Sequence, residues 1–169
     1  GAAAVPRADR APGWVASVVL RTPSACCLHA EDDGGGFSRA DIGGLLDSLE
    51  PNYLGWSARM APVFMGNPER PELGGELTNS FCRTDPEMAR AFARATFLSD
   101  NRADLDSVSV PTLVIECERD AIAPRSVGAF IAAAVPDCAL VTLDAVGHCP
   151  QLSAPEETAR AIASFAAWR

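Results

Sequence analysis

Two residues of this chain have the types and the spacing of an acid–base pair. Asp120 follows the apolar run Leu113–Cys117, and His148 follows the apolar run Ala139–Leu143. They lie 148 − 120 = 28 residues apart, which leaves room for one helix and one strand between them. A carboxylate beside an imidazole fixes its tautomer and stabilises its charged form, which is the assistance that a serine nucleophile needs. The pair therefore predicts acid–base chemistry at two strand ends.

Each of these residues also has an ordinary structural explanation. An Asp after a buried strand is often a turn or helix-cap residue, and a His after Gly is often a loop residue. Their joint occurrence at successive strand ends favours a functional pair, because the carboxyl ends of neighbouring parallel strands meet at one edge. Cys149 is a much weaker candidate for a thiol nucleophile. Neighbouring residues in a tight turn rarely point their side chains at each other.

The elements that must position this pair alternate between strands and helices. Short apolar runs without polar alternation are typical of strands buried on both faces. Three such runs occur, at Ala16–Leu20, Val110–Ile115 and Ala139–Leu143. Helical spacing of apolar residues separates the last two runs and follows the third, which indicates an α/β fold with parallel strands and right-handed crossovers. In the last helix we expect three residues to face inward: Ile162, Phe165 and Ala166.

Between the first two runs the apolar period becomes helical, over residues 38–98. Ser38 with Asp41 predicts an N-terminal cap, and Thr84–Glu87 combines a capping box with an early Pro. We expect the last of these helices to bury one apolar face, made of Met88, Ala91, Phe92 and Ala95. The chain therefore divides into a core, residues 1–37 and 99–169, and an inserted helical block, residues 38–98.

The composition excludes several classes of partner. The 169 residues carry 14 Arg, no Lys and 22 acidic residues, for a net charge of −8. An acidic chain without a basic cluster argues against nucleic acid or an anionic membrane surface as partner. No apolar run approaches the length of about 18 residues that a membrane span needs.

The cysteines and histidines predict neither a metal site nor a disulfide framework. The six Cys form no CxxC, and the only two His, His29 and His148, are far apart in the sequence. A chain with this many apolar segments has no need of disulfides to stabilise a small core, so we expect free thiols and a cytoplasmic location.

Three stretches resemble the α/β-hydrolase superfamily. Asp120 in "ERDAIAP" and His148 in "GHCPQLSAPEE" resemble the last two members of its catalytic triad, which follow each other in this order. Residues 35–105, which begin "GGFSRADIGG", resemble the helical lid of one subfamily. That subfamily comprises stress-sigma-factor regulators of the RsbQ type and the plant karrikin and strigolactone receptors. The resemblance runs from about Ala16 to Phe165 and is strongest to the RsbQ type.

The resemblance implies the fold and the pocket. We expect the C-terminal part of an α/β-hydrolase fold, about three parallel strands with a four-helix lid inserted between them. It places four residues around an apolar cavity above the triad: Phe37, Met60, Leu77 and Phe97. Ordinary helix–helix core contacts are the alternative for each of them. The resemblance implies no metal and no organic cofactor.

The nucleophile of that family is missing from the sequence. No Gly-x-Ser-x-Gly elbow precedes the first strand, and the nearest string, Gly55–Arg59, lies inside a helical pattern. Residues Gly1–Ala4 resemble the helix after the elbow, so we expect the chain to lack the N-terminal part of the fold and to be inactive by itself. The segment with Cys26, Cys27 and His29 departs from the family, and we expect no functional role for these three residues.

Two functions from different classes follow. The first is a serine hydrolase of a small apolar ester or lactone, to which this chain contributes Asp120 and His148. The second is a regulator that senses a small hydrophobic ligand and passes a lid movement to a signalling protein, with slow or incidental hydrolysis. A haloalkane dehalogenase or a peroxidase variant fits the helical block less well.

Overall fold

Three parallel strands form a single sheet at the centre of the fold. The computed structural model describes residues 15–28 and 36–167. Within them, β1 (Val18–Arg21), β2 (Thr112–Arg119) and β3 (Cys138–Val146) pair in the order β1-β2-β3. Each of the three apolar runs is thus confirmed as a strand. Burial on both faces, expected of such runs, is found for β2 alone: β1 alternates between buried and exposed residues, and Val19 of β1 and Leu140 of β3 are exposed.

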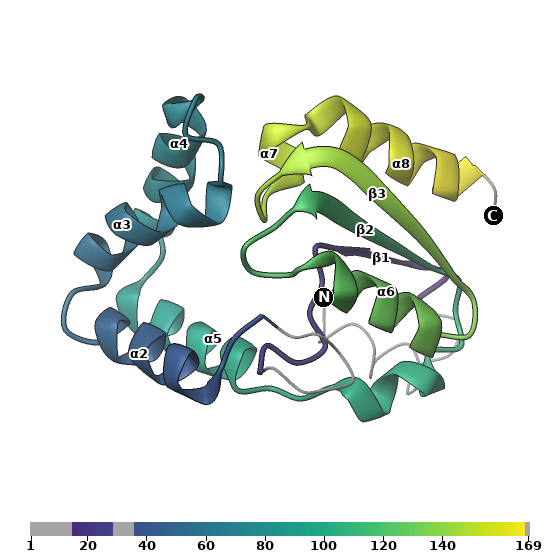
Figure 1. The fold of residues 1–169 in the computed structure, drawn as a ribbon, viewed down its shortest axis with the longest axis horizontal. Coiled ribbons are helices and arrows are strands. Elements are labelled where there is room, and N and C mark those ends of the chain that lie inside the picture. The colour runs from purple at the N-terminus through teal and green to yellow at the C-terminus, as the bar shows by residue number, and fades with distance from the viewer. Residues whose placement is uncertain (1–14, 29–35, 168–169) are drawn as a thin grey trace.

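The middle strand is buried on both faces because helices cover the sheet from two sides. On one face Val114 contacts α6 (Arg125–Ala134), and on the other Leu113 and Ile115 belong to the cluster that includes Phe165 of α8 (Pro155–Ala167). Figure 1 shows α6 and α8 on opposite sides of the strands. A strand enclosed in this way has no solvent face, which explains its continuous apolar run.

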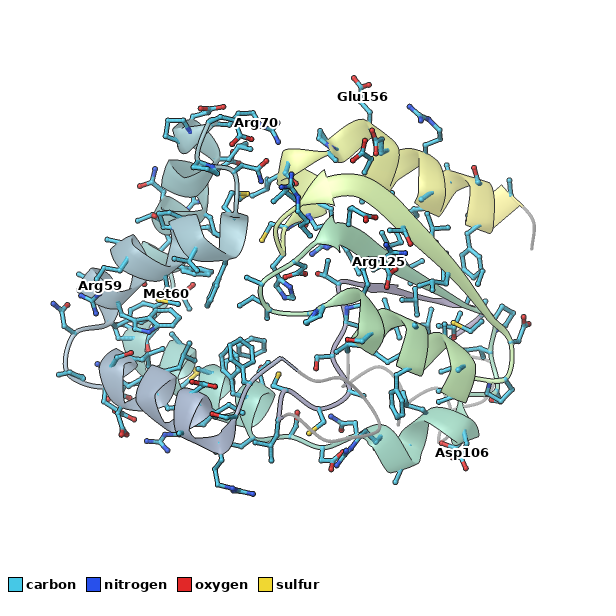
Figure 2. The ribbon with its side chains drawn as sticks, viewed as in Figure 1. Arg59, Met60, Arg70, Asp106, Arg125 and Glu156 are labelled. Carbon is cyan, nitrogen blue, oxygen red and sulfur yellow. The ribbon has the colours of Figure 1, made fainter. Side chains whose placement is uncertain are left out.

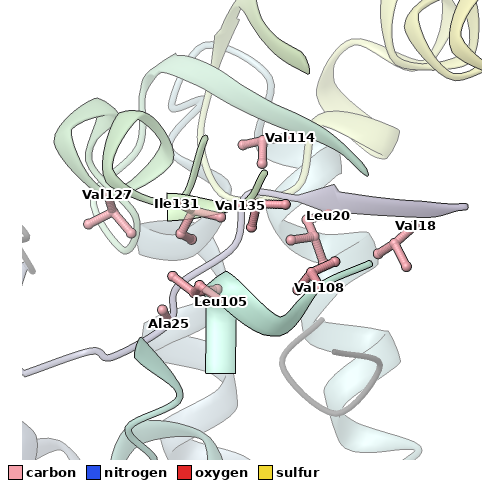
Figure 3. Packing of buried hydrophobic residues seen from close by; sticks show 9 residues of the cluster. All are labelled: Val18, Leu20, Ala25, Leu105, Val108, Val114, Val127, Ile131 and Val135. Atoms are coloured by element: carbon pink, nitrogen blue, oxygen red, sulfur yellow. The ribbon is translucent and has the colours of Figure 1, made fainter. Parts of the chain in front are cut away.

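The core beneath β1 joins segments that are far apart in the sequence. It brings together β1, the short 3-10 helix η1 (Arg102–Ser107) and α6. Nine buried residues form it, as Figure 3 shows: Val18, Leu20, Ala25, Leu105, Val108, Val114, Val127, Ile131 and Val135. The helical spacing predicted from Val127 to Val135 is therefore that of a buried face.

The prediction for the last helix was correct at only one of its three positions. Phe165 is buried, whereas Ile162 and Ala166 are exposed. The buried positions of α8 are Thr158 and Phe165, with Ala161 half-buried between them. These residues follow one helical stripe, and Ile162 lies a further 100° around the helix from Ala161. A short helix, α7 (Pro150–Ser153), precedes α8.

Four helices lie between β1 and β2 in the sequence, as predicted for this fold. They are α2 (Arg39–Leu49), α3 (Tyr53–Met65), α4 (Pro71–Cys82) and α5 (Pro86–Phe97). Figure 1 shows them gathered on the side to which the strands point. α3 packs on α4, and α2 packs on α5. No helix of the described residues is long and apolar enough to cross a membrane.

The first cap was predicted correctly and the second was not. Ser38 and Asp41 form a complete capping box at the start of α2. At the start of α5 the cap is Asp85 rather than Thr84. The Asp85 carboxylate accepts hydrogen bonds from the backbone N–H of Glu87 at 2.9 Å and of Met88 at 3.0 Å. Asp is at least as good a cap as Thr, and here it stands directly before the Pro that opens the helix.

The predicted buried face of α5 is wrong. Met88 is 63% exposed and Phe92 is 73% exposed, and Ala91 and Ala95 are exposed as well. The face toward α2 consists instead of residues spaced four apart: Ala89, Ala93 and Phe97.

Two ion pairs accompany this orientation of the helix. Arg94 contacts the Glu50 carboxylate at 2.7 Å, and Arg90 lies 3.6 Å from it. Glu50 is the C-cap residue of α2, so both arginines stand on the side of α5 that faces α2. This arrangement leaves the more apolar stripe of α5 in solvent.

Candidate active site

Asp120 stands at the carboxyl end of β2 and is held by its own loop. Its side chain is 0% exposed. One carboxylate oxygen, Oδ1, accepts hydrogen bonds from the backbone N–H groups of Ile122 at 2.8 Å and Ala123 at 3.2 Å. The other oxygen, Oδ2, lies 2.8 Å from Nδ1 of His148. Because the loop occupies one oxygen, the other is directed at the imidazole.

His148 follows β3 and presents its ring between Asp120 and solvent. The ring side chain is 30% exposed, in contrast to the enclosed carboxylate. With Nδ1 donating to Asp120, the neutral ring has Nε2 as its acceptor. The structure thus brings together the two residues that the sequence spacing predicted as a pair, and it leaves the second ring nitrogen for a reacting group.

The backbone on both sides of His148 is hydrogen-bonded to distant elements. Its N–H donates to the carbonyl of Phe64 in α3 at 2.8 Å, and its carbonyl accepts from the Thr22 hydroxyl at 3.0 Å. The preceding residue, Gly147, donates its N–H to the Arg119 carbonyl at 2.7 Å. Three separate segments therefore determine where the imidazole stands.

The end of α3 lies so close to this loop that only Gly fits at position 147. Gly147 has φ +92°, and a Cβ there would collide with the backbone oxygen of Met65. Asn67 fastens the same contact, because its side-chain amide donates to the carbonyls of Met65 at 2.6 Å and Val146 at 2.9 Å. The helical block is thus joined to the His148 loop through backbone atoms.

An Asp and a His brought together in this order after parallel strands occur in a large class of enzymes. The model of the family described as "Alpha/beta hydrolase family" matches residues 1–161. The chain belongs to this family. The fold and the superfamily resemblance predicted from the sequence are therefore confirmed.

Relatives within the alpha/beta hydrolase family include plant esterases and receptors. The chain is 32% identical over 152 residues to strigolactone esterase D14 of Arabidopsis thaliana. The aligned region covers 89% of this chain and 57% of that protein. It is 29% identical to karrikin insensitive 2 receptor IA of Petunia hybrida, over 87% of this chain and 54% of that protein. The chain therefore spans little more than half the length of these relatives.

Solved structures of the family superpose on the chain. A hydrolase from Oleispira antarctica has a TM-score of 0.87 at 33% identity and covers 96% of this chain and 60% of its own. An enol-lactonase from Burkholderia xenovorans has a TM-score of 0.81 at 19% identity, with the same coverage of both chains. The second likeness, at this low identity, concerns the fold alone.

The four residues predicted around an apolar cavity fall into two clusters. The rings of Phe37 and Phe97 meet edge to face at 6.1 Å, and Met60 packs against the same cluster of the helical block. In Figure 2 Met60 is labelled on α3, away from the sheet. Leu77 is buried in a different cluster, between α3 and α4, with Ala61. A cavity formed by all four remains a prediction.

A hollow of about 490 Å³ lies beside the Asp120 loop. The residues that line it include Val63, Glu118 and Arg125. None of the four predicted cavity residues lines this hollow, and neither does His148. Asp120 itself and Gly147, the neighbour of His148, do line it, so the hollow borders the loops that carry the pair.

The chemistry of the thiols argues against a cysteine nucleophile. Burial raises the pKa of the Cys149 thiol, and burial, with the nearby charge of Asp120 as a smaller cause, raises the pKa of Cys117 to about 12. Both thiols are therefore poor sources of thiolate near neutral pH. Cys26 and Cys27 are buried, and His29 lies outside the described residues. Within the described part of the chain, no three His, Cys, Asp or Glu residues form a group that could hold a metal.

Sequence reasoning missed the residues that hold His148 from outside its loop. Thr22, Phe64 and Asn67 carry no motif, and the contact between Thr22 and His148 spans 126 residues. Only Asn67 had a local signal, as part of a Gly-Asn-Pro turn. Ser57, the serine of the nearest elbow-like string, is buried inside α3 and donates its hydroxyl to the Tyr53 carbonyl at 2.8 Å.

Proposed function

We propose that the chain supplies the general base and its orienting carboxylate to a serine-hydrolase site. The observation that carries this proposal is the 2.8 Å contact between His148 Nδ1 and Oδ2 of a fully buried Asp120. In this role, Nε2 of His148 accepts the proton of a serine hydroxyl as that oxygen attacks an ester carbonyl. It then returns the proton to the departing alcohol oxygen. Asp120 keeps the ring in the required tautomer and stabilises its charged form.

The serine itself is proposed to come from outside the printed sequence. The sequence holds no Gly-x-Ser-x-Gly string, and Ser57 is enclosed in a helix. The chain alone should therefore show no esterase turnover, and the activity belongs to a protein that also contains a nucleophile.

For the substrate we propose a small, mostly apolar ester or lactone. Support comes from the aromatic cluster of the helical block, in which the rings of Trp56, Phe64 and Phe81 lie 5.9 to 6.3 Å apart. Because the backbone carbonyl of Phe64 also binds His148, this cluster adjoins the acid–base pair. The similarity to a strigolactone esterase points to the same bond type.

We further propose that residues 38–98 act as a lid on a core made of residues 1–37 and 99–169. Two hydrogen-bonded contacts between the helical block and the core support this division. Asn67 binds Val146 beside the His148 loop, and Arg70 donates to the Ser153 carbonyl at 2.8 Å. Figure 2 labels Arg70 at the point where the α3–α4 connection meets the region of α7.

The six free cysteines fit a reducing compartment, and we propose the cytoplasm as the location. The acidic net charge of −8 keeps nucleic acid and anionic membranes out of the proposed set of partners.

Ester turnover by the full-length protein tests the catalytic proposal. We expect His148→Ala and Asp120→Asn to lower kcat for nitrophenyl esters by about 10⁴-fold, as expected when the tautomer or the base is lost. Asp106→Asn is the matched control, because Asp106 is an exposed Asp of η1, labelled in Figure 2, and takes no part in the hydrogen bonds of Asp120 and His148. Turnover that survives His148→Ala would contradict the assignment.

A ligand-sensing regulator of the RsbQ type is the second proposal. It is favoured by the direct hydrogen bond from His148 to α3, through which a ligand in the helical block can affect the site, and by the receptor names among the relatives. In this case, binding of a signalling protein should survive His148→Ala but fail in Leu77→Trp, which fills the space between α3 and α4. Partner binding that is lost in His148→Ala but survives in Leu77→Trp would contradict the regulator and leave the hydrolase as the remaining proposal.

A further inference from the structure

Thr22 has an unusual backbone conformation for a β-branched residue. It directly follows β1 and has φ +43°, the only positive φ of a non-Gly residue in the described part of the chain. In this region Cβ crowds the following carbonyl, which is why Gly usually occupies it and β-branched residues rarely do. Such strain persists only where surrounding contacts impose it, and it is concentrated at functional sites.

The contacts of Thr22 show what imposes this conformation. The residue is 5% exposed, so its polar groups need partners within the protein. Its N–H donates to the Ile115 carbonyl at 2.7 Å, which extends the pairing of β1 with β2 by one residue. Its hydroxyl donates to the His148 carbonyl at 3.0 Å. The strained residue therefore connects the central strand to the backbone of the proposed general base.

This bond completes the restraint of the His148 backbone. α3 holds the N–H side through Phe64, and Thr22 holds the carbonyl side. The two restraints differ in rigidity, because α3 belongs to the proposed lid, whereas Thr22 is bonded to the buried centre of the sheet. The bond from Thr22 thus joins the Gly147–Arg119 backbone bond and the Asp120 contact in holding the His148 loop to the core of the fold.

We infer that Thr22 is a positioning residue that fixes His148 relative to the reacting atoms. The inference rests on the proposed hydrolase function and extends it to a residue outside the acid–base pair. Thr22 acts through the backbone of His148 and touches no reacting atom. Its hydroxyl therefore affects the rate of the proton transfer and has little effect on substrate binding.

Three substitutions separate the hydroxyl from the shape and the strain of Thr22. Thr22→Ser keeps the hydroxyl, and Thr22→Val keeps the branched shape without it. Thr22→Gly removes the hydroxyl but also relieves the strain at φ +43°. In the full-length protein we expect kcat to fall about tenfold in the Val and Gly variants, with KM within about twofold of the wild type. The Ser variant should stay within about threefold of wild-type kcat.

A second measurement monitors the hydrogen bond between His148 and Asp120 in the absence of substrate. The proton between His148 Nδ1 and Asp120 Oδ2 should give a resolved downfield signal in the ¹H NMR spectrum, which His148→Ala assigns. We expect it in the wild type and in Thr22→Ser, and shifted or broadened by exchange in Thr22→Gly. The Gly variant matters most, because it removes the hydroxyl while it relieves the backbone strain, and its urea unfolding curve shows whether the loss occurs in folded protein.

Wild-type kcat and an unchanged signal in Thr22→Gly would overturn the inference, as would a loss in Thr22→Ser equal to that in Thr22→Val. Failure of the proposed function looks different. In that case His148→Ala itself retains turnover, while the NMR comparison still reports whether Thr22 holds the His148–Asp120 contact.

Discussion

At the scale of single residues, the position of His148 depends on the absence of a side chain next to it. Gly147 combines φ +92° with a backbone oxygen of α3 in the place of its Cβ. We expect Gly147→Ala to lower the free energy of unfolding by about 2 kcal/mol or more, because either the loop or α3 must move. Urea denaturation measures this.

Gly75→Ala is the matched control for that substitution. Gly75 lies within α4, and a Cβ there would meet nothing within 4 Å. In an open helical position Ala is favoured over Gly, so this variant should be more stable by about 0.5–1 kcal/mol. Equal stability of the two variants would show that α3 does not press on the His148 loop.

At the scale of elements, the start of α2 depends on pH. The Ser38 hydroxyl, and then its backbone N–H, hold the pKa of the Asp41 carboxyl below its ordinary value of 3.8. Because the folded pKa is the lower one, this contribution to stability is present above the ordinary value and is lost as pH falls through the folded pKa. Asp41→Asn should remove that part of the acid dependence.

Urea unfolding at about pH 5 and about pH 3 checks this prediction. The difference in stability between wild type and Asp41→Asn should shrink toward the lower pH. The exposed Asp47, on the same helix, is the control, because Asp47→Asn removes a carboxylate without touching the cap. A difference between wild type and Asp41→Asn that is constant with pH would exclude a role of the charged cap.

At the scale of the whole molecule, β1 is the weak point of the sheet. Among the described residues β1 pairs with β2 only, and Val19 on this strand is partly exposed. An open strand edge with apolar side chains is a template for pairing with other chains. We therefore expect this chain, by itself, to be insoluble or dimeric.

Sedimentation velocity tests this expectation, with Val19→Arg as the variant that puts a charge on the edge strand. The variant should increase the monomer fraction, because charged side chains oppose pairing between edges. A monodisperse, monomeric wild-type chain that melts cooperatively would contradict the prediction.

Short sequence patterns were sufficient to predict the features that depend on short-range interactions. The three strands follow from short apolar runs, of which only that of β2 is buried on both faces. The cap at Ser38 follows from two side chains only three residues apart. The Asp120–His148 pair was predictable because adjacent parallel strands must end at the same edge, whatever the rest of the fold does. Spacing along the chain is sufficient for each of these features.

The errors and omissions arose where a distant partner decided the outcome. The apolar period of α5 favoured burial of Met88 and Phe92, but α5 packs on α2 through Ala89, Ala93 and Phe97, which leaves that stripe in solvent. Thr22 has no motif, because its role comes from a contact across 126 residues.

The sequence by itself thus determined the α/β class, the order of its elements and the Asp120–His148 pair. Only the tertiary structure decided which helix faces are buried and what holds the imidazole. The physical reason is that strand ends and helix caps are short-range, whereas the rotation of a helix and the restraint of a loop depend on contacts that exist only after the chain has folded.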